Sequence, residues 1–225
     1  MDIDEFDHAV IRAVFDQAAL RGWGDVSLAE VALDAGLDLA RLRARFPSRN
    51  AVLLRFGVHA DAAALAAANS PGTPREKLFD MLMNRFEALQ LHRGGIMALL
   101  AALPSDPGSA LVLGAATLGS MRWLLEAAGV PVSGPVGILR VNGLLAAWLY
   151  ALRAWQRDES ADLAGTMAAV DRALDRAMQA ERSLPFRPRA VAEPPPEPAV
   201  EPVAEPEPPT VMPPDDLPGS SPTVI

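Results

Sequence analysis

A four-residue turn between two short apolar-periodic segments constrains the fold of this chain more than any other feature. The turn is Ala35-Gly36-Leu37-Asp38. Gly36 can adopt the left-handed conformation that ends a helix, and Asp38 can cap the helix that follows. Apolar residues recur at helical spacing on both sides: Leu28, Val31 and Ala32 before the turn, and Leu39, Leu42 and Phe46 after it. The pattern predicts a helix-turn-helix.

Helical periodicity continues along most of the chain, and no strand-like alternation occurs. Gly, Pro and polar breaks separate the periodic segments. A capping box of Ser27 and Glu30 predicts the start of the second helix. The other helices are expected at 4–20, 39–45, 49–69, 74–91, 93–103, 108–128, 134–157 and 160–182. The sequence therefore predicts an all-α fold.

Composition divides the chain into three parts. Residues 1–56 form the expected helix-turn-helix domain, whose fourth helix continues to about 69, and residues 70–182 form a helical bundle. Beyond them, 14 of the 21 prolines lie from Pro185 onward, mixed with glutamate. Such a segment buries too little apolar area to offset its ordering entropy. We expect residues 183–225 to be a disordered tail, either solubilising or used for docking.

The charge is unevenly distributed. The net charge is -8, but the region from Leu184 onward holds seven acids against two arginines and accounts for -5 of it. Residues 38–55 hold five arginines and one acid, a net +4. Screening limits electrostatic reach to roughly 10 Å, so the local charge decides what this patch attracts. The patch fits phosphate binding, and a solvated helix face is the alternative.

Length and composition limit the protein class. With 225 residues, half of them hydrophobic, the chain can build one sizeable domain or two small ones. It has no cysteine, which excludes disulfides and thiolate metal sites and fits a reducing, cytoplasmic setting. The N-terminus is acidic, unlike a secretory signal. No apolar run approaches 18 uninterrupted residues, so we expect no membrane-spanning segment.

The N-terminal third resembles the tetracycline-repressor (TetR/AcrR) family of transcription regulators. The resemblance covers about residues 5 to 60 and rests on separate short pieces: Phe15, Gly22, Ser27, Ala35-Gly36-Leu37, Phe46-Pro47-Ser48-Arg49 and Leu53-Leu54. It implies a dimeric, DNA-binding regulator with no cofactor, which acts on double-stranded DNA. In that family the third helix usually begins with small polar residues and carries a phosphate-contacting Tyr; Arg43 stands at the Tyr position here.

The resemblance implies where DNA would be contacted. The third helix would enter the major groove, and the arginines on and beside it would meet phosphates or base edges. The candidate DNA-binding residues are Ser27, Asp38, Leu39, Ala40, Arg41, Arg43, Arg45 and Arg49.

The helical body is expected to dimerise and to sense a ligand. Segments 134–157 and 160–182 match the two helices that form a four-helix bundle with their copies in the TetR family. Aromatic and methionine side chains suit adaptable apolar pockets. The candidates for a pocket are Met97, Met121, Trp123 and Trp148, and ordinary core packing is their alternative role.

The chain lacks the patterns of an enzyme or a metal site. The histidines His8, His59 and His92 share no metal-ligand spacing, and no nucleophile elbow or Gly-rich phosphate loop occurs. We therefore expect neither catalysis nor a bound metal.

A rival resemblance concerns the end of the body. Residues 155–174, with a Trp, an Asp-x-Ser step and a closing amphipathic helix, look like the end of a TetR-fold lipid-binding family of ubiquinone biosynthesis. That family implies lipid binding without DNA binding, through a helix that could touch a membrane. A plain interaction module with a docking tail is a third interpretation.

Overall fold

The computed structural model of the protein describes residues 2–182, so the expected tail, 183–225, lies outside the described residues. Residues 2–182 contain helices and no strand, which confirms the all-α prediction. The α-helices are α1 (Ile3–Arg21), α2 (Leu28–Asp34), α3 (Leu39–Arg45), α4 (Arg49–Leu65), α5 (Pro74–Gln90), α6 (Arg93–Ala102), α7 (Pro107–Ala127), α8 (Gly134–Trp155) and α9 (Ala164–Arg182). Two short 3-10 helices, η1 (Trp23–Asp25) and η2 (Leu103–Ser105), join them.

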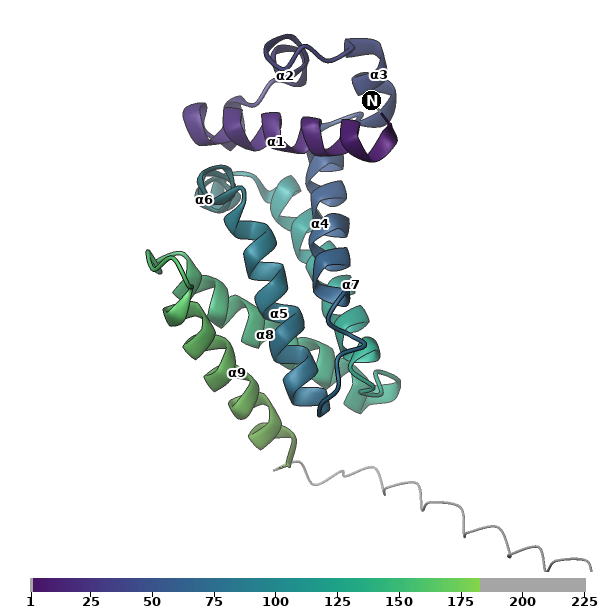
Figure 1. The fold of residues 1–225 in the computed structure, drawn as a ribbon, viewed down its shortest axis with the longest axis vertical. Helices are drawn as coiled ribbons and strands as arrows, with labels where there is room; N and C mark the ends of the chain where they lie inside the picture. The colour runs from purple at the N-terminus through teal and green to yellow at the C-terminus, as the bar shows by residue number, and fades with distance from the viewer. Residues whose placement is uncertain (1, 183–225) are drawn as a thin grey trace, which may run out of the picture. The chain divides into compact units, whose positions relative to one another are not determined.

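Helix α1 supplies the core of the N-terminal group. It lies across α2, α3 and the start of α4 (Figure 1). A stripe of its apolar side chains recurs every three to four residues and is buried: Phe6, Val10, Ile11, Val14, Phe15 and Ala18. This stripe is wide enough to pack against the helix-turn-helix on one side and the body on the other.

The helix-turn-helix group and the body share one continuous hydrophobic core. Helix α4 runs from the first into the second and packs against α5 and α7, and α8 packs along α9 (Figure 1). Helix α6 approaches α1 closely at Gly95, where an added Cβ would lie 2.3 Å from the Phe15 carbonyl oxygen. A glycine at this position is therefore required by contact rather than by backbone conformation.

Two helix ends differ from the sequence predictions by four residues. Helix α4 ends at Leu65 rather than near 69, because the following residues form tighter i→i+3 turns before Ser70-Pro71. Helix α9 begins at Ala164 rather than near 160. The Asp158 carboxylate accepts hydrogen bonds from the Thr166 N–H at 2.6 Å and the Thr166 hydroxyl at 2.8 Å, and it also binds Ser160. Hydrogen bonds from Ser160 and Thr166 hold the pKa of Asp158 well below its ordinary range.

Helices α7 and α8 are, by length and composition, apolar enough to cross a membrane, and about 33% of the apolar window of each is buried inside the fold. Counting uninterrupted apolar runs missed them, because single polar residues interrupt both helices. Core helices of soluble proteins pass the same test, so the finding is weak evidence for a membrane.

Candidate nucleic-acid interface and ligand cavities

The predicted helix-turn-helix forms with the expected caps. The Ser27 hydroxyl accepts from the Glu30 N–H at 3.4 Å at the start of α2. Gly36 has a φ of 61°, the left-handed conformation expected at the turn. The Asp38 carboxylate accepts from the Arg41 N–H at 2.6 Å at the start of α3. Sequence and structure agree here because each feature depends on residues no more than three positions apart.

The capping box forms only by half. The Ser27 N–H donates to Gln17 Oε1 of α1 at 2.8 Å, the bond that the Glu30 side chain would make in a full box. Glu30 instead accepts from Gln17 Nε2 at 3.3 Å and from Arg21. The sequence spacing predicted that Glu30 would accept from the Ser27 N–H, but Gln17 of the neighbouring helix accepts that hydrogen bond instead.

Helix α3 presents an exposed face to solvent. Leu42 is 1% exposed and anchors α3 on the core, whereas Leu39 is 52% exposed. Leu39 shares the helical spacing of Leu42 but lies outside the buried face. Ala40, Arg41 and Arg43 are exposed beside Leu39. The Arg41 guanidinium donates to the Asp2 carbonyl at 3.1 Å and lies 4.2 Å from the centre of the Phe6 ring.

Two arginines of the basic segment converge on one buried carboxylate. Asp7 of α1 is fully buried and pairs with Arg45 through two hydrogen bonds of 3.0 and 2.7 Å. It also accepts from Arg55 Nε at 2.5 Å. Burial alone would raise the pKa of Asp7, but hydrogen bonds and charge from Arg45 and Arg55 hold it below its ordinary value. The three residues tie α1, α3 and α4 together.

Arg49 is also engaged within the protein. Its guanidinium donates to the carbonyls of Trp23 and Gly24 at 3.1 and 2.7 Å and to the Asp106 carboxylate at 3.1 Å. It thereby links the start of α4 to η1 and to the start of α7. Arg43 differs, because its one hydrogen bond within residues 2–182 goes to the Pro47 carbonyl at 3.4 Å.

The candidate DNA-binding residues thus divide into two sets. Leu39, Ala40, Arg41 and Arg43 lie together on the exposed face of α3, with Ser27 and Asp38 at the helix starts. Arg45 and Arg49 point to internal acids. Segment charge could not separate the sets, because the acids that bind these arginines lie 38 and 57 positions away in sequence.

The structure brings together two histidines that sequence spacing had left apart. His59 Nδ1 of α4 lies 2.9 Å from His8 Nε2 of α1, and His8 Nδ1 lies 2.8 Å from the Asp4 carbonyl. Burial, with the nearby His8 and Arg55, lowers the pKa of His59. His92 stacks on Phe15 at the same joint between α1 and the body, with ring centres 5.3 Å apart. Burial lowers its pKa as well.

The four expected pocket residues are scattered. Trp123 is 64% exposed on α7, and Met121, its near neighbour, is fully buried in the core. Trp148 is buried and stacks on Phe86, with ring centres 4.4 Å apart. Met97 is half-buried against the core. None of the four lines either of the two cavities described below.

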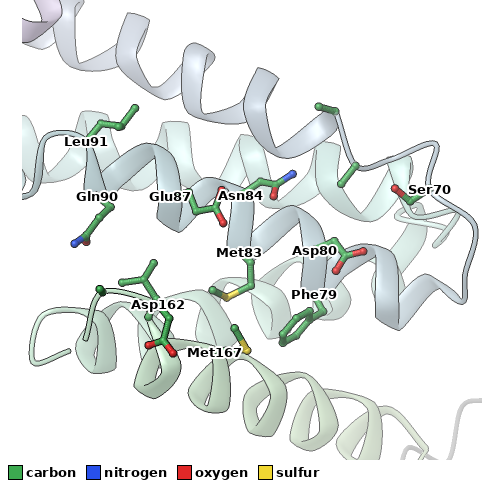
Figure 2. A pocket seen from close by; sticks show the side chains of 14 residues that line it. Ser70, Phe79, Asp80, Met83, Asn84, Glu87, Gln90, Leu91, Asp162 and Met167 are labelled. Carbon is green, nitrogen blue, oxygen red and sulfur yellow. The ribbon is translucent and has the colours of Figure 1, made fainter. Parts of the chain in front are cut away.

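The first cavity, of about 830 Å³, lies between the end of α4, α5 and the start of α9. Figure 2 shows Phe79, Met83 and Met167 gathered on its apolar side. Its charged lining residues, Asp80, Glu87 and Asp162, are all acidic. An anionic ligand would be repelled here.

The second cavity, of about 750 Å³, is bounded by α5, the end of α7, α8 and α9. Its lining is mainly aliphatic, and its polar members include Arg75, Arg140, Tyr150 and Arg176. The volume lies within the ordinary range for small-molecule sites.

A buried charged cluster lies elsewhere in the body. Arg85 of α5 pairs with Asp61 of α4, and the Ser120 hydroxyl donates to the same carboxylate at 2.6 Å. Burial lowers the pKa of Arg85 to about 10. The Arg85 guanidinium lies 5.2 Å from the centre of the Trp148 ring. Neither cavity reaches Arg85, so the cluster joins α4, α5 and α7 inside the core.

Helices α7 and α8 also carry apolar side chains on their outer faces. Those exposed by more than a third are Leu111, Leu118, Trp123, Ile138, Leu139, Leu149 and Tyr150. Helix α9 differs, because its exposed positions include Asp171, Arg172, Asp175 and Arg176. Uncovered apolar surface of this kind is typical of contacts with a partner or a ligand.

The chain is similar to known proteins in its fold rather than in its sequence. No protein-family model and no curated sequence match this chain. A TetR transcriptional regulator from Nitrosomonas europaea is similar in structure, with a TM-score of 0.64 and 20% identity over 78% of this chain and 99% of that one. A TetR regulator from a Rhodococcus species has a TM-score of 0.56 and 16% identity over 79% and 98%. A Streptomyces coelicolor TetR-family regulator has a TM-score of 0.55 and 18% identity over 80% and 83%. The described part of this chain therefore has the fold of TetR-family transcriptional regulators.

Proposed function

We propose that the protein is a homodimeric DNA-binding transcription regulator whose helical body binds a small apolar molecule. The observation that carries the proposal is a helix-turn-helix with both helices capped and the outer face of α3 exposed. The fold it shares with TetR regulators supports the same function. Such a protein acts in the cytoplasm and needs no catalytic group.

Helix α3 would lie in the major groove. Arg43 would meet a phosphate or a base edge, and Leu39 and Ala40 would contact the thymine methyl group or the sugar edge. Arg45 and Arg49 would act indirectly, by fixing α3 and α4 on α1 and α7. Ligand binding would change the spacing between the two recognition helices of the dimer, a rigid-body switch.

Dimerisation would use the outer face of α8. Ile138 and Leu149 are exposed there. We expected α9 to contribute as well, and its charged outer positions favour a smaller, peripheral share.

Selection from a pool of random duplexes tests the DNA-binding proposal. A two-fold dimer should enrich a palindromic site whose half-sites lie about one helical turn apart. The Arg43→Ala variant should enrich the site less, and it leaves the cluster of Asp7, Arg45 and Arg55 in place. Failure of the wild type to enrich any sequence over the input pool would contradict the proposal.

A second function, lipid binding without DNA binding, is favoured by a specific observation. Acids of the same chain pair with Arg45, Arg49 and Arg55. These pairs reduce the positive charge of the basic segment that the sequence predicted. The aliphatic second cavity and the exposed apolar residues of α7 and α8 fit the same interpretation. Isoprenoid or acyl lipid retained through purification, together with no DNA binding at low salt, would replace the regulator proposal with this one.

A further inference from the structure

The second cavity has a long apolar interior. Leu78 of α5, Leu125 of α7, Leu144 of α8 and Leu174 of α9 all line it. A Cβ added at Gly143 in the same wall would meet no atom within 4 Å, so open space lies directly over the α8 backbone. An aliphatic chain is the occupant that such a lining excludes from water most favourably.

Tyr150 and Arg176 both line this cavity, and Arg172 reaches Tyr150 from the same helix as Arg176. Tyr150 of α8 is 40% exposed. Arg172 and Arg176 of α9 both donate hydrogen bonds to its hydroxyl, and these bonds lower its pKa. The Arg176 guanidinium carbon also lies 5.3 Å from the centre of the Tyr150 ring. Two like charges four residues apart on one helix repel each other, and a bound anion would remove that repulsion.

The other charges around the cavity are already neutralised. Arg75 pairs with Asp171 at 2.6 Å and Asp175 at 2.7 Å, and Arg140 pairs with Glu181 at 2.5 Å. Asp171, Asp175 and Glu181 are therefore engaged by these two arginines. Within residues 2–182 neither Arg172 nor Arg176 forms an ion pair, so they remain as the positive charge available to a ligand.

We propose that the second cavity binds a single-chain anionic amphiphile, such as a fatty carboxylate. The alkyl chain lies between α5, α7, α8 and α9, and the head group lies against Arg172, Arg176 and Tyr150. This site replaces the pocket expected from Met97, Met121, Trp123 and Trp148. It names the ligand class of the ligand-binding body proposed above and is independent of DNA binding.

Calorimetric titration of the delipidated full chain tests the proposal with three probes. Dodecanoate carries chain and charge, dodecanol carries the chain alone, and acetate carries the charge alone. We expect 1:1 binding of dodecanoate, weaker binding of dodecanol and no measurable binding of acetate. Equal affinity for dodecanoate and dodecanol, or no binding of dodecanoate, would overturn the proposal.

Two variants separate the head-group site from the chain site. Replacing Arg172 and Arg176 together by Gln should weaken dodecanoate binding by about tenfold or more and leave dodecanol binding nearly unchanged. Gly143→Leu fills the open space and should weaken both ligands. Arg122→Gln, on the exposed face of α7 away from the cavity, is the matched control and should change neither.

Circular dichroism of each variant checks that the fold is intact. If Gly143→Leu unfolds the protein, Gly143→Val at the same position gives the smaller obstruction. Unchanged dodecanoate affinity in the double arginine variant would overturn the head-group assignment. Because DNA binding is measured separately by duplex selection, a failure of the amphiphile site cannot be confused with a failure of the regulator proposal.

Discussion

The basic segment of the helix-turn-helix end and the arginine pair of α9 differ in their partners. At the first, Arg45, Arg49 and Arg55 are held by carboxylates from other helices. In the body, Arg172 and Arg176 meet on the hydroxyl of Tyr150 and have no acid partner within residues 2–182. The difference teaches that a basic run in a sequence measures the charge present, whereas only the fold decides how much of it is available to a ligand.

The largest expected effect separates a buried side chain of α8 from an exposed one on the same helix. Trp148 is 4% exposed and stacks on Phe86, so Trp148→Asp should unfold the protein, at a cost above about 4 kcal/mol. Ile138 is 65% exposed on the same helix, so Ile138→Asp should leave the fold intact and convert the dimer to monomer. Circular dichroism and light scattering of both variants would check this. A folded Trp148→Asp protein would contradict the packing described for the body.

At the helix-turn-helix end, Asp7→Asn should be the most damaging single change. It leaves Arg45 and Arg55 beside a buried neutral group, and breaking such a pair costs about 3 kcal/mol. Asp4→Asn is the control, because Asp4 contacts the same Arg55 but has a side chain 76% exposed. Urea denaturation should show a large loss for Asp7→Asn and little change for Asp4→Asn. Equal losses would mean that the buried cluster does not stabilise this region.

The joint between the two regions can be probed at Gly95. Gly95→Ala drives a Cβ against the Phe15 backbone, so α6 must move away from α1, at a cost of about 2 kcal/mol. Gly114→Ala in α7 is the matched change, since its Cβ would meet nothing within 4 Å, and it should be neutral or slightly stabilising. Thermal melting would rank the two. A neutral Gly95→Ala would show that α1 and α6 are not in close contact.

The division of the basic residues predicts different outcomes for two arginine variants. Arg43→Ala should weaken DNA binding and lower the salt slope by about one unit per lost contact, with unchanged stability. Arg45→Ala should instead lower the stability through Asp7, and its DNA binding should fall only as folded protein is lost. Anisotropy titrations with duplex DNA, beside melting curves, would separate them. The reverse pattern would reassign Arg45 to the DNA interface.

The smallest expected effect is a pH dependence at the joint. The folded-state pKa values of His59 and His92 lie below their ordinary value of 6.5, so the folded protein prefers both neutral. The stability they contribute is complete above that pH and is lost as the pH falls through it toward the folded-state pKa values. Melting temperatures should fall by a few degrees between pH 7.5 and 5.5.

The variants His59→Gln and His92→Gln are the test of this cause. Each should flatten the fall in melting temperature, since Gln does not titrate in this range. The charged and titratable groups facing His59 are His8, Arg55, Asp4 and Asp7. If a variant with both substitutions shows the same fall in melting temperature as the wild type, the pH dependence comes from other groups.

Local features of the sequence predicted much of the fold. The caps at Ser27 and Asp38 and the left-handed Gly36 each depend on neighbours within a few residues, and all three were confirmed. Features that depend on partners far away in the sequence were not predicted. The half-replaced capping box, the late start of α9 and the pairing of His8 with His59 all arise from contacts between helices.

The candidate site was harder to predict for the same reason. The position of α3 followed from the turn, but the partners of Arg45 and Arg49 lie far away in sequence. For the cavity, the aromatic and methionine residues of the sequence pointed to Trp148 and Met121, but both side chains pack in the core. The signal that the sequence analysis did not use was the pair Arg172 and Arg176, four residues apart on an amphipathic helix. The neighbouring Asp171 and Asp175 pair with Arg75 instead.

The central claim, that the exposed face of α3 binds DNA although most of the nearby arginines are held internally, is tested most directly by a salt titration. Affinity for a random duplex should fall linearly with salt on logarithmic axes, with a slope well short of the value of about -9 that five phosphate contacts per protomer of a dimer would give. Arg43→Ala should reduce that slope further. No measurable binding at low salt, or a slope that Arg43→Ala leaves unchanged, would contradict the account.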